Sequence, residues 1–177
     1  THARHVALGA VIVLALGLGV VGLARPRWGA AVELQQSRGA DGVVGVDVSE
    51  EALAVARDNA AHLGLAGRCA LLRGDWTAGL QNEAFDIVVS NPPYIATQVI
   101  EELEPEVRDH EPRLALDGGA DGLDASRLLA PEILRVLKPG GQFAVEIGYD
   151  QKDAVEALFR DAGAWQVRTL LDLANRD

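Results

Sequence analysis

The chain alternates short apolar runs with longer segments in which apolar residues recur every three or four positions. Short runs rich in β-branched residues predict buried strands, and longer periodic segments bounded by capping residues predict helices. The predicted strands are residues 11–16, 42–49, 68–75, 85–90, 142–148 and 165–173. The predicted helices are residues 49–64, 125–137 and 151–163, with the KPGG at residues 138–141 ending the second. A long loop is predicted at residues 91–124.

Strands that alternate with helices predict an α/β fold, in which helices cover both faces of a mostly parallel sheet. In such sheets ligands bind at the carboxyl ends of the strands. The residues that directly follow the predicted strands are therefore the first candidates for a site. They are residues 17–22, Asp47, Asp75, Trp76, residues 91–94 and residues 146–148.

Residues 6–24 form an unbroken apolar stretch with four glycines. By length it fits a membrane span or the core of a signal peptide. A buried strand, a glycine turn and a buried helix also give a continuous apolar run. We favour this second interpretation and keep a membrane-tethered form as an alternative.

Gly17, Gly19 and Gly22 fit the spacing G-x-G-x-x-G after the first predicted strand. Glycines there let the backbone approach a ligand, although close packing of small residues explains the spacing equally well. An acid after the next strand is the expected partner of such a loop, because it binds ribose hydroxyls. Asp47 occupies that place, with a role in capping the following helix as the structural alternative.

Asp75 and Trp76 end the third predicted strand. A tryptophan can cover an aromatic base and an aspartate can accept a hydrogen bond from an exocyclic amine. A turn aspartate followed by a packing tryptophan is the structural alternative.

The sequence SNPPY at residues 90–94 carries the most specific signal. Proline fixes its own φ and pushes the residue before it into an extended conformation. Asn91 and Pro92 therefore present a rigid pair of acceptors, the Asn91 side chain and the Pro92 carbonyl. Such a pair suits a planar NH₂ group, whose two N–H bonds need two acceptors, with Pro93 and Tyr94 shaping the pocket.

Composition and charge narrow the function. The 177 residues, 49% hydrophobic and 24% charged, suit a single globular domain over residues 1–177. The net charge of −10 argues against nonspecific nucleic-acid binding. A single cysteine, Cys69, favours a reducing, cytoplasmic location.

No metal site is predicted. The four histidines lack metal-ligand spacing, and none is expected to be catalytic. Residues 117–128 resemble a calcium loop only in part, because Gly119 and Leu128 stand where carboxylates are needed.

These motifs together resemble the S-adenosylmethionine-dependent amino-methyltransferases. The NPPY after a strand, the acid after the second strand and the Asp-Trp pair after the third carry the resemblance. The sequences EVRDHEPRLALDGGADGLD and LKPGGQFAVEIGYDQ narrow it to the release factor glutamine methyltransferases, and the match runs over residues 42–163. NPPY alone also occurs in adenine-N6 DNA methyltransferases.

The resemblance implies a Rossmann-like, doubly wound fold whose last strand is antiparallel. It implies that Asn91 and Pro92 hold the glutamine amide of a release factor for methylation, with Pro93 and Tyr94 lining the pocket. It further implies an S-adenosylmethionine site in which each group of residues binds one part of the cofactor. Asp47 is expected at the ribose, Asp75 and Trp76 at the adenine, and Gly17 and Gly19 at the methionine end, and Asn91 is also expected to contact the cofactor.

The first 41 residues depart from the family pattern. Ala15 stands where the family has an acid, Leu18 replaces a small polar residue, and Pro26 interrupts the expected helix. We also expect the helical domain that docks the release factor to be absent.

Four other functions remain open at this stage. They are a ribosomal-protein glutamine methyltransferase, a nucleic-acid adenine methyltransferase, a dinucleotide-binding oxidoreductase, and a folded remnant that binds no cofactor.

Overall fold

A computed structural model describes residues 11–16 and 42–170. The strands are β1 (Val11–Leu16), β2 (Gly42–Asp47), β3 (Cys69–Arg73), β4 (Phe85–Asn91) and β5 (Leu137–Val145). The α-helices are α1 (Glu50–His62), α2 (Pro105–Arg108), α3 (Arg113–Leu116), α4 (Asp124–Val136) and α5 (Lys152–Asp161). Two short 3₁₀ helices, η1 (Ala66–Arg68) and η2 (Thr97–Glu102), complete the order.

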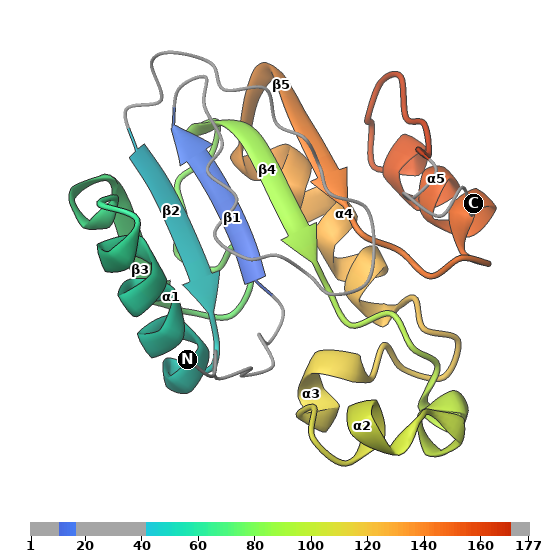
Figure 1. Cartoon of the computed structure of the whole chain (residues 1–177). Coiled ribbons are helices and arrows are strands. Elements are labelled where there is room, and N and C mark those ends of the chain that lie inside the picture. Colours follow the sequence, from blue (N-terminus) through green and yellow to red (C-terminus); the bar gives the residue numbers. More distant parts are fainter. Residues whose placement is uncertain (1–10, 17–41, 171–177) are drawn as a thin grey trace.

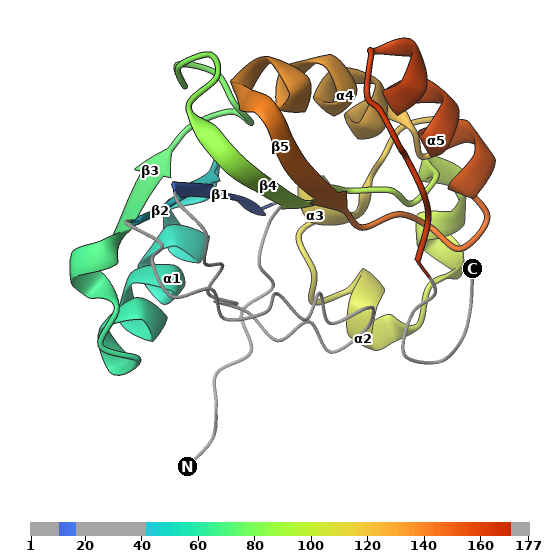
Figure 2. The same cartoon turned by 90° about the horizontal axis from the view of Figure 1, so that it is seen from above.

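The described strands form one sheet in the order β3-β2-β1-β4-β5 (Figure 1). Helix α1 covers one face, and α4 and α5 cover the other (Figure 2). This order is that of a doubly wound nucleotide-binding sheet. The predicted α/β class with helices on both faces is therefore confirmed.

The direction of β1 differs from what a parallel sheet requires. The pairs β2–β3 and β4–β5 are parallel, but β1 runs antiparallel to both β2 and β4. Leu16 consequently lies opposite Gly42, at the edge where β2 begins. The sequence VIVLAL contains no polar position, so its pattern fixes neither register nor direction. The expectation that this strand ends at the same edge as Asp47 is therefore wrong.

The main hydrophobic core lies between the sheet and helices α4 and α5. Val88, Leu129 and Ile133 are completely buried in it. The rings of Phe143 and Phe159 stack with centroids 4.5 Å apart, which joins β5 to α5. This packing fixes β4 and β5 side by side and thereby the segments that follow them.

Two predicted strands differ from the structure. Helix α4 ends at Val136, just before KPGG as expected, but β5 begins at Leu137 and includes KPGG instead of beginning at residue 142. A register shift against β4 lies between Phe85 and Ile87. Residues 165–170, predicted as part of an antiparallel last strand, form no strand. Instead the Thr169 backbone N–H and hydroxyl both donate to the Glu156 carboxylate on α5, at 2.9 and 2.8 Å.

The long apolar stretch is described only in part. Residues 11–16 form β1, and the rest of residues 6–24 lies outside the described residues. Within 11–16 and 42–170, no helix combines the length and the apolar character that a membrane crossing requires.

Candidate active site

The carboxyl ends of β2, β3, β4 and β5 meet at one edge of the sheet. Because β1 is antiparallel to both β2 and β4, these two strands are parallel to each other. Ile12 pairs with Val46 on one side and with Ser90 on the other. The next residues, Asp47 and Asn91, therefore lie level with each other on either side of β1, about 10 Å apart at two strand spacings.

Asp47 is a buried carboxylate with one oxygen left over. Its side chain is at the end of β2, and the residue is 2% exposed. Its Oδ1 accepts a 2.7 Å hydrogen bond from the Ser49 N–H, while its Oδ2 is buried without a partner. Burial raises the pKa of this carboxyl, and the Ser49 and Val48 N–H groups oppose that shift. A buried carboxylate oxygen with no partner is unfavourable unless a ligand supplies a donor.

The surroundings of Asp47 explain why burial raises the pKa of its carboxyl. The crevice between β2 and α1 is lined by Asp47 together with apolar residues such as Ala52 and Leu53, and encloses about 10 Å³. That volume holds no more than about one water molecule. Ser49 also caps α1, since its Oγ accepts from the Ala52 N–H at 3.1 Å. Capping is thus done by Ser49, and Asp47 orients the capping residue.

Asp75 and Trp76 lie in the turn after β3. Asp75 is exposed, whereas Trp76 is half-buried and packs against the main core. The turn is tight, because Trp76 has a φ of 51°. The packing role of Trp76 is thus observed, and its contact with an adenine stays a prediction.

Arg135 of α4 fixes this turn from the neighbouring helix. Its guanidinium donates to the carbonyl oxygens of Thr77 and Leu80 at 3.1 and 3.0 Å and to Asn82 Oδ1 at 2.8 Å. Thr77 is fully buried, and its hydroxyl donates to Glu132. The sequence offered no signal for this network, because an arginine on a periodic helix resembles any surface arginine.

The segment 91–94 leaves the end of β4 with its prolines packed inward. Asn91 is exposed, Pro92 and Pro93 are buried, and Tyr94 is half-buried. The two buried prolines thus anchor this segment in the protein interior, while Asn91, the last residue of β4, is exposed to solvent. The arrangement leaves the two acceptors expected from the sequence, the Asn91 side chain and the Pro92 carbonyl, next to each other in the chain.

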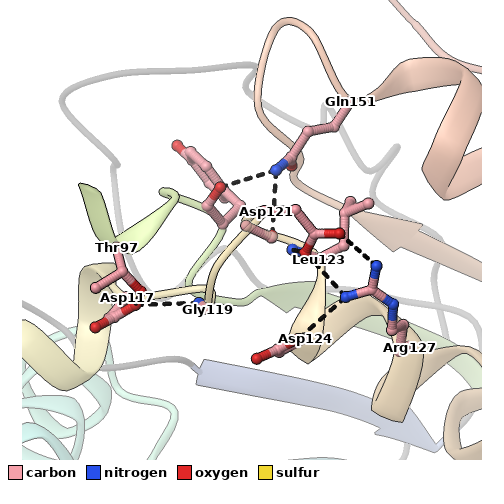
Figure 3. A network of polar contacts seen from close by, with 10 residues as sticks. Thr97, Asp117, Gly119, Asp121, Leu123, Asp124, Arg127 and Gln151 are labelled. Atoms are coloured by element: carbon pink, nitrogen blue, oxygen red, sulfur yellow. Dashed lines mark hydrogen bonds and ion pairs between the residues drawn. The ribbon is translucent and has the colours of Figure 1, made fainter. Parts of the chain in front are cut away.

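The residues after Tyr94 are tied to the turn at residues 117–122. The Ile95 N–H donates to the Leu116 carbonyl and the Ile95 carbonyl accepts from the Gly118 N–H, at 3.0 and 2.8 Å. The Thr97 hydroxyl donates to Asp117 Oδ1 at 2.6 Å, and the same oxygen accepts from the Gly119 N–H (Figure 3). The segment predicted from the sequence as a long loop therefore contains three short helices, η2, α2 and α3, and its two ends are hydrogen-bonded to each other.

Tyr94 also contacts the segment after β5. Its hydroxyl donates a 3.0 Å hydrogen bond to Glu146 Oε1. Burial, together with the charge and the hydrogen bond of Glu146, raises the pKa of Tyr94 to about 12. Burial also raises the pKa of Glu146, and the Tyr94 hydroxyl opposes that shift. Glu146 directly follows the apolar run FAV, and this position after a predicted strand makes it a candidate from the sequence alone.

Two further residues at this edge were not predictable from the sequence. Ser90 is 2% exposed and its hydroxyl has no partner. Gln151, just before α5, is buried, and its side-chain amide donates to the Tyr94 and Gly122 carbonyls. Neither had a signal, since a serine before a turn and a glutamine before a helix are common surface residues.

Three expected site residues remain untested by the geometry. Gly17, Gly19 and Gly22 lie outside the described residues. Within the part of the chain that is described, no group of histidine, cysteine and acidic side chains is arranged to hold a metal ion.

Comparison with known proteins identifies the class. Residues 29–169 match the family model described as "Methyltransferase domain". The chain belongs to this family of methyltransferase domains, and the resemblance found in its motifs is confirmed.

Curated relatives carry a more particular name, "Release factor glutamine methyltransferase". The Caulobacter vibrioides protein is 72% identical over 134 residues, which cover 76% of this chain and 46% of that protein. The Moorella thermoacetica protein is 51% identical over 136 residues, covering 76% and 48%. The Gloeobacter violaceus protein is 43% identical over 159 residues, covering 89% and 56%. The chain thus spans about half the length of the curated relatives it matches.

Proposed function

We propose that this chain transfers a methyl group from S-adenosylmethionine to the side-chain amide nitrogen of glutamine in the Gly-Gly-Gln motif of peptide chain release factors. The observation that carries the proposal is the segment Asn91-Pro92-Pro93-Tyr94 at the carboxyl end of β4, with its prolines buried and its tyrosine hydrogen-bonded. The names of the relatives described above support the choice of substrate. We propose a cytoplasmic location, where release factors act.

The acceptor site has to solve one chemical problem. An amide nitrogen is a poor nucleophile, because its lone pair is delocalised into the carbonyl. Two acceptors, the Asn91 side chain and the Pro92 carbonyl, would take the hydrogen bonds of the NH₂ group and orient the nitrogen. Tyr94, fixed by Glu146, would pack against the flat amide. Catalysis of this kind rests on position and electrostatics.

The described residues fit the cofactor at the ribose end. Asp47 Oδ2 is buried without a partner and is suited to accept a hydrogen bond from a ribose hydroxyl. Asp75 and Trp76 lie at the same edge and are the proposed neighbours of the adenine, while Gly17 and Gly19 remain candidates for the methionine end. When bound, S-adenosylmethionine supplies a methyl group on a positively charged sulfur. The sulfur leaves as a neutral thioether, and the methylated amide nitrogen gives up one proton to water.

The substrate is proposed to be a protein rather than a nucleic acid. Residues 97–124, which follow the acceptor segment, contain nine aspartates and glutamates against two arginines. A surface of this composition repels a phosphate backbone. A ribosomal protein or an adenine-containing nucleic acid is the other substrate that the assay must include.

The test begins with calorimetric titration of the purified chain with S-adenosylmethionine. Transfer of a labelled methyl group is then measured to a release factor, to the same factor with Gly-Gly-Glu, to a ribosomal protein, and to adenine-containing DNA. We expect cofactor binding and methylation of Gly-Gly-Gln only. Asn91→Ala should abolish transfer while changing cofactor affinity much less.

Methylation of DNA but not of the release factor would reject the proposed substrate. A folded chain that binds no cofactor would reject the activity altogether, and would mark the chain as a methyltransferase fold without catalysis.

A further inference from the structure

Tyr94 is held at both ends by residues of a single segment, 146–151, which connects β5 to α5. At the side-chain end, the Tyr94 hydroxyl donates to Glu146 Oε1 at 3.0 Å. At the main-chain end, the Tyr94 carbonyl accepts from Gln151 Nε2 at 2.9 Å. Neither partner is close to Tyr94 in sequence, so the fold brings all three together.

Gln151 is built into the structure rather than resting on its surface. It is 7% exposed, and its amide nitrogen donates a second hydrogen bond to the Gly122 carbonyl at 3.1 Å. Its Oε1 accepts from the Gly148 N–H at 2.9 Å. Figure 3 shows its side chain reaching down toward the turn that carries Asp121. One side chain therefore joins the acceptor segment, the 117–122 turn and the start of α5.

Gly122 shows how closely these segments approach. A Cβ on this residue would overlap the Tyr94 carbonyl oxygen and lie 2.5 Å from Gln151 Nε2. The φ of Gly122 is +75°, which side-chain-bearing residues rarely adopt. The contact around Gln151 thus requires glycine at this position.

Glu146 is anchored to β4 as well as to Tyr94. Its backbone N–H donates to the Ser90 carbonyl at 3.0 Å, one residue before Asn91. The carboxylate is therefore placed by the strand that carries the acceptor segment itself. A half-buried carboxylate in this position fixes the direction of the phenol, because a hydrogen bond to a charged group is stronger than one between neutral groups.

We propose that Glu146 and Gln151 are positioning residues of the acceptor site, which fix the ring and the main chain of Tyr94 and thereby the geometry of the Asn91–Pro92 acceptors. The proposal rests on the function proposed above and adds two residues to it. Glu146 acts as a hydrogen-bond acceptor, not as a proton acceptor from the substrate. Gln151 acts through its two N–H donors.

The first test uses conservative and truncating variants of the full chain in the methyl-transfer assay. Glu146→Ala should lower kcat about tenfold, and Glu146→Gln, which keeps an oxygen in the same place, should restore most of it. Gln151→Ala should also lower kcat about tenfold, but Gln151→Glu should restore nothing, because an ionised glutamate has no donor. The dissociation constant of S-adenosylmethionine should stay within about twofold throughout, since neither Glu146 nor Gln151 is among the proposed cofactor contacts.

Two exposed residues serve as matched controls. Glu51→Gln on α1 and Gln142→Glu on β5 make the same chemical changes away from the site and should leave kcat unchanged. If Glu146→Gln is as impaired as Glu146→Ala, the carboxylate has a chemical role and the positioning role is rejected. If cofactor affinity falls in parallel with kcat, the residues support the fold or the cofactor instead.

A double-mutant cycle separates the two ends of Tyr94. Tyr94→Phe removes the hydroxyl, so Glu146→Ala should cost nothing further in that background. Gln151→Ala should keep its full effect there, because it acts on the carbonyl. Full additivity of the Tyr94 and Glu146 changes would overturn the proposal.

A readout that needs no activity distinguishes this proposal from the proposed function. The ¹³Cζ resonance of Tyr94, observed in a Tyr149→Phe chain and titrated to alkaline pH, reports the contact with Glu146. Glu146→Gln should lower the pKa of Tyr94 below about 12, since the charge of Glu146 raises it, and Glu51→Gln should not. An unchanged pKa would reject the Glu146 contact. A shifted pKa in a chain that methylates no substrate would reject the function and leave the contact in place.

Discussion

Asp47 and Asn91 stand level with each other on either side of β1, each at the carboxyl end of its strand. Ile12 sets this level, because it pairs with Val46 in β2 and with Ser90 in β4. The separation of about 10 Å follows from two strand spacings. In the proposed reaction Asp47 holds the ribose and Asn91 the acceptor amide, so the transferred methyl group would lie between these two residues. The sheet, and not a flexible loop, therefore sets the distance between the two halves of the site.

The first prediction concerns the charge of Asp47. Replacing Asp47 with Asn should weaken S-adenosylmethionine binding by about tenfold or more, because a hydrogen bond to a charged group is lost. The same change should increase the free energy of unfolding at neutral pH by about 1 kcal/mol, because it removes a buried charge with an unpaired oxygen. Calorimetry and thermal unfolding of the two chains measure both effects.

The stability gained by Asp47→Asn should depend on pH. Burial raises the pKa of Asp47 above its unfolded value. Its contribution to stability is therefore fully present below the unfolded pKa and is lost as pH rises through the folded pKa. The stability advantage of Asp47→Asn should therefore shrink as pH falls through the raised folded pKa, and should have reached its minimum below the unfolded pKa. An advantage that grows on acidification would contradict the raised pKa.

The sequence determined some elements because their signals are local. Helix α1 was predictable from its Ser49 cap and its apolar spacing, and the end of β4 from two prolines. The direction of β1 was not, because six apolar residues in a row suit either orientation. Nor was the absence of a strand at residues 165–170, where Thr169 donates two hydrogen bonds to the Glu156 carboxylate on α5. Side-chain contacts between distant residues leave no periodic pattern.

The residues of the candidate site also fall into two groups, those that the sequence indicates and those that only the fold reveals. Asp47 and Asn91 were predictable, because a polar residue at the end of an apolar strand is visible in the sequence. Gln151 was not, because its importance comes from carbonyl groups of Tyr94 and Gly122 that only the fold brings near.

The second prediction concerns the buried hydroxyl of Ser90. Its oxygen has no partner although the residue is 2% exposed. Ser90→Ala should therefore increase the free energy of unfolding of the ligand-free chain by about 1 kcal/mol, because an unsatisfied polar group is removed. Urea unfolding measures the change, and an unchanged m-value shows that the two chains expose the same surface. A loss of stability would mean that the hydroxyl is bonded in solution.

The third prediction concerns Gly122. Gly122→Ala should lower the free energy of unfolding by about 2 kcal/mol or more, because the new methyl group meets the Tyr94 carbonyl and the backbone has a positive φ. Gly79→Ala is the matched control. Gly79 has a φ of +81°, but open space surrounds its Cβ position, so only the backbone cost of about 1 kcal/mol remains. Equal losses at the two positions would show that the approach to Tyr94 and Gln151 is not tight.

The fourth prediction concerns the arginine that holds the turn after β3. Arg135 donates to the Thr77 and Leu80 carbonyls and to Asn82, so Arg135→Ala leaves several acceptors without a donor. The free energy of unfolding should fall by about 2 kcal/mol. Arg135→Lys should recover only part of this, because an ammonium group cannot reproduce the fork of the guanidinium.

Hydrogen exchange locates the effect of Arg135. Protection should be lost selectively in residues 75–82, the turn that carries Asp75 and Trp76, if Arg135 acts by holding that turn. Arg127→Ala is the control, since Arg127 pairs with Asp121 and Asp124 on the surface and should cost less than about 1 kcal/mol. If S-adenosylmethionine affinity also falls in Arg135→Ala but not in Arg127→Ala, the turn belongs to the cofactor site. Unchanged affinity with a loosened turn would remove Asp75 and Trp76 from that site and leave Trp76 as a packing residue.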